Sequence, residues 1–207
     1  QLFMADASSD TVVELDLESR AIIASGVAAP TSDPRSLGGI LGRLYIGSGG
    51  SNQSWELDPA TRLVIGSPVS SFTGGIGGTS ARLYGFAWNP GVSYELDPNT
   101  RLDITGGGVP PIGNPAGGGG TTSRVYYSNG STLYEINPDT LLDISGGGVS
   151  SPAGGVSGMG VAGERLYIVV SGANDKTFEI DPDTLLDISG GGSGAGVNTP
   201  QGIGGTF

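Results

Sequence analysis

The 207-residue sequence contains no cysteine and no histidine. These absences exclude disulfide scaffolds, thiolate nucleophiles, ordinary zinc sites and serine–histidine–aspartate chemistry. Long hydrophobic runs are missing as well: the longest apolar stretch, residues 21–29, is interrupted by Ser25 and Gly26 and is too short to cross a bilayer. We therefore expect no membrane insertion.

Positive charge is scarce. Nine Lys and Arg residues face 20 Asp and Glu residues, which gives a net charge of −11, and Lys176 is the only lysine. Nucleic-acid binding needs a basic stripe that displaces phosphate counterions, and no such stripe exists here. The same deficit disfavours anionic membrane surfaces. The sequence thus predicts no nucleic-acid partner.

Glycine is abundant, with 40 residues, yet it does not recur at every third position as it does in collagen. Recurrent Leu-Tyr and Ile runs separate the glycine-rich segments, and a disordered low-complexity chain would lack such runs. The glycines are therefore expected to serve turns and close packing in an ordered fold.

Three short blocks recur in fixed order along the whole chain. The first is Leu-Tyr or a close variant, beginning at Leu2, Leu44, Leu83, Val125 and Leu166. The second contains a glutamate before Leu or Ile and then Asp or Asn, at Glu14, Glu56, Glu95, Glu135 and Glu179. The third is an aliphatic run at residues 21–23, 63–65, 102–104, 142–144 and 186–188. A period of roughly 40 residues with several short strands per unit indicates propeller blades.

A glycine-rich segment before each Leu-Tyr block supplies a fourth strand, which we place innermost, where backbones crowd together. The prediction is an all-β single domain over residues 1–207: one five-bladed β-propeller with four-stranded antiparallel blades. The repeat units are about 1–42, 43–81, 82–123, 124–164 and 165–207. Residues 202–207 should pair beside residues 1–6, so that the C-terminal strand closes the ring.

Acidic residues recur at positions that favour structural roles. Asp-Pro-x-Thr, as at Asp58 and Asp97, predicts a tight turn between two strands. The five recurrent glutamates have near-equivalent surroundings, unlike the paired carboxylates of a glycosidase. We expect them to bond to neighbouring blades through the recurrent arginines. A further set on the outermost strand should discourage edge pairing: Asp103, Asp143 and Asp187.

The pattern Leu-Tyr followed by Tyr-Glu-Ile-Asp-Pro-x-Thr resembles the blades of bacterial β-propellers in the YVTN/NHL/SMP-30-like group. The resemblance covers essentially the whole chain. Those blades usually carry Gly after the Thr, whereas this chain has Arg62, Arg101, Leu141 and Leu185. The group includes hydrolases, binding platforms and cell-surface modules, so the resemblance implies a fold and leaves the function open.

Binding residues are expected on the face that carries the loops between the second and third strands and the outer-to-inner connections. Trp88 is the foremost candidate, because an exposed Trp can stack on a sugar or on a partner protein; packing over the top of the ring is the alternative. Polar candidates in the same loop set are Asn89, Asn52, Asn129 and Asn174.

Metal and cofactor sites have little support. Calcium is the one metal that oxygen ligands alone could hold, and its weak candidates are Asp175, Asp181 and Asp183, which lack EF-hand spacing. Residues 158–163 match the spacing of a dinucleotide-binding loop but precede no helical pattern. We expect no metal and no cofactor.

Four functions remain open. The first is a non-enzymatic recognition or scaffold module, extracellular or virion-exposed, that binds a protein or carbohydrate through its loop face. The second is a lectin-like propeller, although its loops differ in length and content. The third is a hydrolase with a carboxylate or metal site at the channel mouth. The fourth is an engineered or recently amplified repeat protein without a selected ligand.

Overall fold

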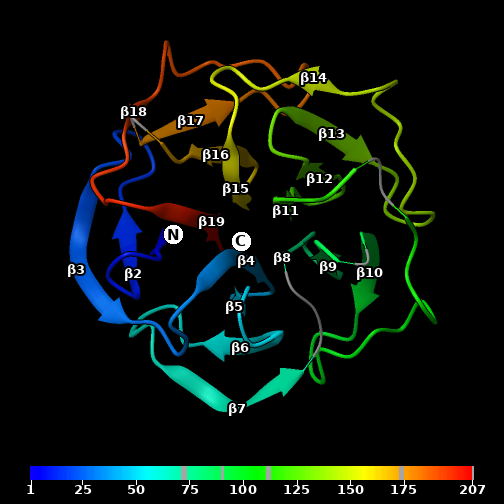
Figure 1. Ribbon diagram of the computed structural model, residues 1–207, viewed down its shortest axis with the longest axis horizontal. Helices are drawn as coiled ribbons and strands as arrows, with labels where there is room; N and C mark the ends of the chain where they lie inside the picture. The colour runs from blue at the N-terminus through cyan, green and yellow to red at the C-terminus, as the bar shows by residue number, and fades with distance from the viewer. Residues whose placement is uncertain (71–73, 90, 111–112, 173–174, 207) are drawn as a thin grey trace.

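The computed structural model describes residues 1–70, 74–89, 91–110, 113–172 and 175–206. It confirms the predicted architecture: five antiparallel blades surround a central axis, as Figure 1 shows. The described residues form no helix, and therefore contain none that could span a membrane.

Each blade runs from an innermost strand at the axis to an outer strand at the rim. Blade one comprises β19 (Pro200–Gly205), β1 (Leu2–Asp6), β2 (Thr11–Leu15) and β3 (Ile22–Ala28). Blade two comprises β4 (Pro34–Ile40), β5 (Arg43–Ser48), β6 (Gln53–Leu57) and β7 (Val64–Ser70). Blade three comprises β8 (Gly74–Gly78), β9 (Leu83–Ala87) and β10 (Val92–Leu96). Blade four comprises β11 (Gly117–Gly120), β12 (Val125–Ser128), β13 (Thr132–Ile136) and β14 (Val149–Ser150). Blade five comprises β15 (Val156–Ala162), β16 (Arg165–Val170), β17 (Lys176–Ile180) and β18 (Ser193–Gly194).

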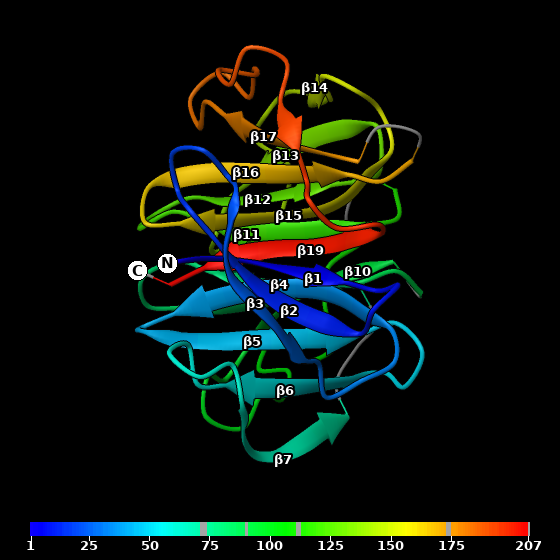
Figure 2. The same cartoon turned by 90° about the vertical axis from the view of Figure 1, so that its left-hand side faces the viewer.

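The ring closes as predicted, because the last strand completes the first blade. In β19 and β1, Gly205 pairs with Leu2 and Gly204 pairs with Phe3 in antiparallel register. Both chain ends consequently lie near the axis, and the side view in Figure 2 shows β19 against β1. β19 thereby covers the axial edge of β1, which would otherwise be open to pairing with another strand.

The hydrophobic core lies between blades rather than in one central mass. At the boundary of blades one and two, Phe3 and Val12 pack with Leu37, Leu44 and Ile46. Corresponding clusters fill the other four boundaries. Alternate residues of each middle strand face the two neighbouring blades, so both faces are buried and the strands read as continuous apolar runs.

The innermost strands are glycine-rich because they lie too close for side chains. A methyl group on Gly38 would approach the carbonyl oxygen of Ile76 to 2.2 Å, and one on Gly160 would approach that of Ile203 to 1.8 Å. Even β15 and β4, which belong to non-adjacent blades, have Cα atoms within 8 Å of each other. The predicted axial crowding is therefore confirmed.

The outer strands differ among blades. In blade three the outer strand is reduced to backbone bridges from Ser93 to Val109 and from Leu96 to Asp103. The Asp103 carboxylate accepts hydrogen bonds from the amide of Thr105 at 2.7 Å and of Gly107 at 2.8 Å. The same pattern recurs at Asp143 and Asp187. These aspartates thus organise the glycine turns that follow them, a role that the edge-protection interpretation did not include.

The residue after each Asp-Pro-x-Thr turn, and after the Asn-Pro-Asp-Thr turn of blade four, adopts the left-handed backbone conformation. Its φ is 60° at Arg62 and 58° at Arg101, Leu141 and Leu185. This conformation explains why similar blades carry Gly there. Here the side chains are retained and buried against the preceding blade: Arg101 Nη1 lies 3.6 Å from Glu56, and Leu141 joins the core between blades three and four.

Candidate functional site

A hollow of about 340 Å³ opens on the face where the innermost strands begin, which we call the upper face. We call this hollow the axial cup. Its lining residues come from all five blades: Arg35, Gly49, Gly74, Trp88, Pro115, Ala116, Val156, Ser157 and Gln201. Several lining residues lie at the first residues of the innermost strands β4, β8, β15 and β19, which surround the axis in Figure 1, so the cup lies at the upper end of the axis.

Trp88 supplies the one large aromatic surface among the lining residues. It follows β9 in the loop to β10, and 53% of its surface is exposed. Gly74, with φ 130°, has no room for a side chain, because a methyl group there would approach the Phe86 carbonyl oxygen to 2.1 Å and the Trp88 amide nitrogen to 3.2 Å. The backbone leading into Trp88 therefore packs closely against Gly74, while more than half of the Trp88 surface stays open to solvent.

Arg35 is the one charged residue among those that line the cup. Its Nε donates a 2.8 Å hydrogen bond to Asp33, and 51% of its side chain remains exposed. A side chain at Gly49 would collide with this pair, since its Cβ would lie 2.7 Å from both Arg35 Nε and Asp33 Oδ2. The glycine thus makes room for an oriented guanidinium at the rim.

Ser157 and Gln201 provide the remaining polar side chains of the cup. The Ser157 hydroxyl donates to the backbone carbonyl of Pro200 at 2.6 Å. This bond ties blade five to blade one and engages the hydroxyl proton. Gln201 is half-buried at the start of β19. Each innermost strand pairs with only one neighbour in its blade, so alternate backbone groups also face the axis.

Three of the predicted polar binding residues, Asn52, Asn89 and Asn129, lie on the upper face, but they do not line the cup. Asn52 and Asn89 are exposed loop residues, and Asn52 occupies a turn with φ 53°. Asn129 accepts a 3.2 Å bond from the Thr132 amide and donates a 3.1 Å bond to the Tyr134 hydroxyl, so it organises its own turn. Asn174 lies outside the described residues.

Sequence reasoning found Trp88 but missed Arg35, Ser157 and Gln201. A signal for Arg35 was present in the repeat. Seven of the eight arginines occupy one of two recurrent positions. Four precede a Leu-Tyr block, and the other three follow the turn between the third and fourth strands of a blade, as at Arg20, Arg62 and Arg101. Arg35 occupies neither position, so the repeat architecture gives no structural reason for its presence.

The weak calcium candidates are separated by the length of a strand. Asp175 precedes β17 on the upper face, whereas Asp181 and Asp183 follow the strand on the opposite, lower face. Asp181 accepts bonds from the amides of Asp183 and Thr184, both at 2.8 Å. Within the described part of the chain, no three acidic residues converge in a geometry that would hold a metal ion.

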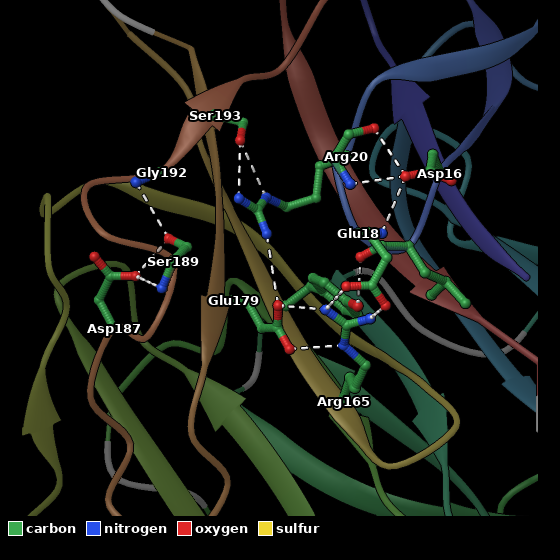
Figure 3. A network of polar contacts seen from close by, with 12 residues as sticks. Asp16, Glu18, Arg20, Arg165, Glu179, Asp187, Ser189, Gly192 and Ser193 are labelled. Carbon is green, nitrogen blue, oxygen red and sulfur yellow. Dashed lines mark hydrogen bonds and ion pairs between the residues drawn. The ribbon is translucent and has the colours of Figure 1, made fainter.

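The lower face carries a repeated ion-pair network instead. In Figure 3, Arg165 forms two 2.7 Å bonds with Glu179 in its own blade and a 2.5 Å bond with Glu18 in blade one. Arg20 of blade one lies 3.5 Å from the same Glu179 and donates to Ser193 at 2.9 Å. Similar arginine–glutamate pairs are Arg43–Glu56, Arg82–Glu95 and Arg124–Glu135. Each of these three pairs lies within a single blade.

Contacts to a neighbouring blade are made by three of the five glutamates: Glu14 with Arg62 at 3.2 Å, Glu56 with Arg101 at 3.6 Å and Glu179 with Arg20. The glutamates therefore form structural ion pairs with the recurrent arginines, but among the described residues the expected bond to a neighbouring blade is absent at Glu95 and Glu135.

Comparison with known proteins supports the β-propeller fold but assigns neither a family nor a function. No protein-family model matches the sequence, and no curated protein does either. Glutaminyl cyclase from Myxococcus xanthus has 14% identity and a TM-score of 0.61, over 99% of this chain and 74% of that one. Streptogramin B lyase has 17% identity and a TM-score of 0.52, over 87% and 62% of the two chains.

Hydrazine synthase from Kuenenia stuttgartiensis has 14% identity and a TM-score of 0.52, over 81% of this chain. The chain spans about half of that protein's length, 51%. At these identities the similarity extends to the β-propeller fold alone, which hosts proteins of very different functions.

Proposed function

We propose that this propeller is a non-enzymatic recognition module that holds part of a ligand in the axial cup. The observation that carries the proposal is the position of Trp88: an exposed indole lines the same hollow as an oriented guanidinium, and every blade contributes to that hollow. Exposed aromatic rings on rigid scaffolds commonly provide the contact area of a binding site.

The chemistry of the lining favours binding over catalysis. Acid–base or nucleophilic catalysis needs a side chain whose proton affinity suits the reaction, near a nucleophile or leaving group. The described lining residues include no carboxylate. The Ser157 hydroxyl donates to a backbone carbonyl, so no base withdraws its proton. A hydrolase at the channel mouth is therefore the weaker alternative.

The cup also argues against a lectin with five equal sites. Trp88 comes from blade three, Arg35 from blade two and Gln201 from blade one, so the polar and aromatic groups converge on one site. A carbohydrate in this single cup fits the proposal. Membership of the YVTN/NHL/SMP-30-like group, and an extracellular or virion-exposed location, remain proposals that accompany this function.

An amplified or engineered repeat without a ligand would explain regular blades but not Arg35 and Trp88. Both residues depart from the repeat, and both line the axial cup. Convergence of non-repeated residues on one hollow is what selection for a ligand would produce.

A glycan-array screen of the purified chain, with and without calcium, tests the proposal. Saturable binding should be lost in Trp88→Ala and retained in Leu102→Ala, a matched control with the same 53% exposure on the outer rim. Binding that both variants retain would place recognition outside the cup. Catalytic turnover of a bound glycan would favour the hydrolase.

A further inference from the structure

We infer that the ligand group in the axial cup is a six-membered ring that carries a carboxylate and offers one face for stacking. This inference rests on the proposed function and adds a chemical class to it. Arg35 receives the carboxylate, and Trp88 stacks on the ring.

The geometry of Arg35 suits an incoming anion. Asp33 engages Nε alone, at 2.8 Å, and thereby fixes the plane of the guanidinium. Among the described residues, Nη1 and Nη2 have no hydrogen-bond or ion-pair partner. These two nitrogens present the parallel N–H donors that bind a carboxylate in bidentate fashion.

Arg35 also differs from the other arginines in how its side chain is engaged. The arginines before the Leu-Tyr blocks are each committed to a glutamate, as in Arg43–Glu56 at 2.6 Å. Those at the left-handed positions are buried in blade boundaries, as at Arg101. Arg35 is ion-paired with Asp33 through Nε, so what it offers at the hollow is its two terminal nitrogens, Nη1 and Nη2.

The size and lining of the cup fit one ring. A volume of about 340 Å³ lies at the lower end of the range for small-molecule sites. Trp88 offers a flat apolar face for stacking, and Pro115 adds apolar surface. The half-buried Gln201 amide can both donate and accept, as ring hydroxyl groups require.

Two sources share this chemistry: a terminal acidic sugar and an aromatic carboxylic acid. Both combine a carboxylate with a six-membered ring, and they differ in the hydroxyl groups that Gln201 could contact. Glucuronate and benzoate serve as probes for the two sources. Glucose and benzyl alcohol are the uncharged counterparts.

The indole N–H signals in a ¹H–¹⁵N correlation spectrum provide the readout. The chain has two tryptophans, Trp88 in the cup and Trp55 buried between blades, so Trp55 is an internal reference. Glucuronate or benzoate should shift the Trp88 signal saturably and leave the Trp55 signal in place. Whichever acid binds more tightly identifies the source.

Variants separate the role of the guanidinium from general electrostatics. Arg35→Gln should weaken binding of the acid by about ten- to a hundredfold, the usual range for loss of a charged hydrogen-bond partner. Arg35→Lys should restore part of it. Lys176→Gln, which removes one positive charge from the same face but outside the cup, should change affinity little.

The outcomes distinguish this inference from the proposed function. If glucose or benzyl alcohol shifts Trp88 as strongly as its acid counterpart, and Arg35→Gln has no effect, the cup binds ligands but the carboxylate inference is wrong. If none of the four probes moves the Trp88 signal while the array detects Trp88-dependent binding, the ring-acid class is again wrong. If the array binding also ignores Trp88, the proposed function fails.

Discussion

The hydroxyl of Tyr45 in blade two donates a 3.0 Å hydrogen bond to the backbone carbonyl of Pro98 in the turn of blade three. The same bond joins Tyr84 to Pro138, Tyr126 to Pro182 and Tyr167 to Leu17. Phe3 occupies this position in blade one and has no hydroxyl to donate. Four of the five blade boundaries are therefore linked by a tyrosine, and the boundary of blades one and two is not.

Removing one of these links should destabilise the ring. We expect Tyr45→Phe to lower the free energy of unfolding by about 1 kcal/mol, because the Pro98 carbonyl loses its donor. Tyr94→Phe is the control, since no described residue hydrogen-bonds to the Tyr94 hydroxyl. Denaturant unfolding measures both. Equal effects of the two substitutions would show that the inter-blade bond contributes nothing.

The buried tyrosines should also make the fold sensitive to alkali. Burial raises the pKa of Tyr45 and of Tyr167 to about 12, whereas tyrosine in an unfolded chain ionises near pH 10. The folded state therefore holds these protons more tightly. Its stability should be constant below pH 10 and fall as the pH rises from about 10 to 12. The melting temperature measured as a function of pH tests the loss of stability, and tyrosinate absorbance follows the ionisation. If all tyrosines of the folded protein ionised near pH 10, the prediction would be contradicted.

The turn aspartates should give the opposite dependence at low pH. A hydrogen bond from the Thr100 amide lowers the pKa of Asp97 below 3.8. The stability that the carboxylate contributes is thus present above about pH 4 and lost as the pH falls through the folded-state pKa.

Blade four shows how to test this contribution, because Asn137 accepts the equivalent bonds from the amides of Asp139 and Thr140 at 2.8 and 3.0 Å. Asp97→Asn should keep the melting temperature at neutral pH and reduce its decline in acid. Asp97→Ala should lower the melting temperature at both pH values. Calorimetry would contradict the account if Asn and Ala behaved alike.

Two leucines with left-handed backbone should respond oppositely to glycine. Leu41, with φ 52°, is 64% exposed, so Leu41→Gly should raise the free energy of unfolding by about 1 kcal/mol through relief of backbone strain. Leu141, with φ 58°, is buried between blades. Leu141→Gly should lower stability by about 2 kcal/mol, because lost burial outweighs the relieved strain. Stabilisation by both substitutions would refute the packing role of Leu141.

Most of the fold was predictable because each blade repeats its signals. The glutamates, the Asp-Pro-x-Thr turns and the glycine-rich strands recur at one period, and the number of repeats sets the number of blades. Ring closure followed from a C-terminal strand motif without a blade of its own. The turn role of Asp103 was not predictable from its strand position, since it depends on amides two to four residues later.

The candidate site was only partly predictable, because residues from different blades build it. Trp88 stood out as an unusual loop residue, but its proximity to Arg35 and Gln201 depends on how closely the innermost strands approach the axis. The asparagines are predicted from their loop position alone, and that position does not distinguish a side chain open to a ligand from one engaged in its own turn, as at Asn129. Departure from the repeat, as at Arg35, is the better guide.

A crystal structure of the protein with a ligand identified on the array, or with glucuronate, tests the central claim most directly. We predict density in the axial cup, with a ring over the Trp88 indole and, for an acid, a carboxylate against Nη1 and Nη2 of Arg35. Density at the outer rim or on the lower face, with an empty cup, would contradict the account.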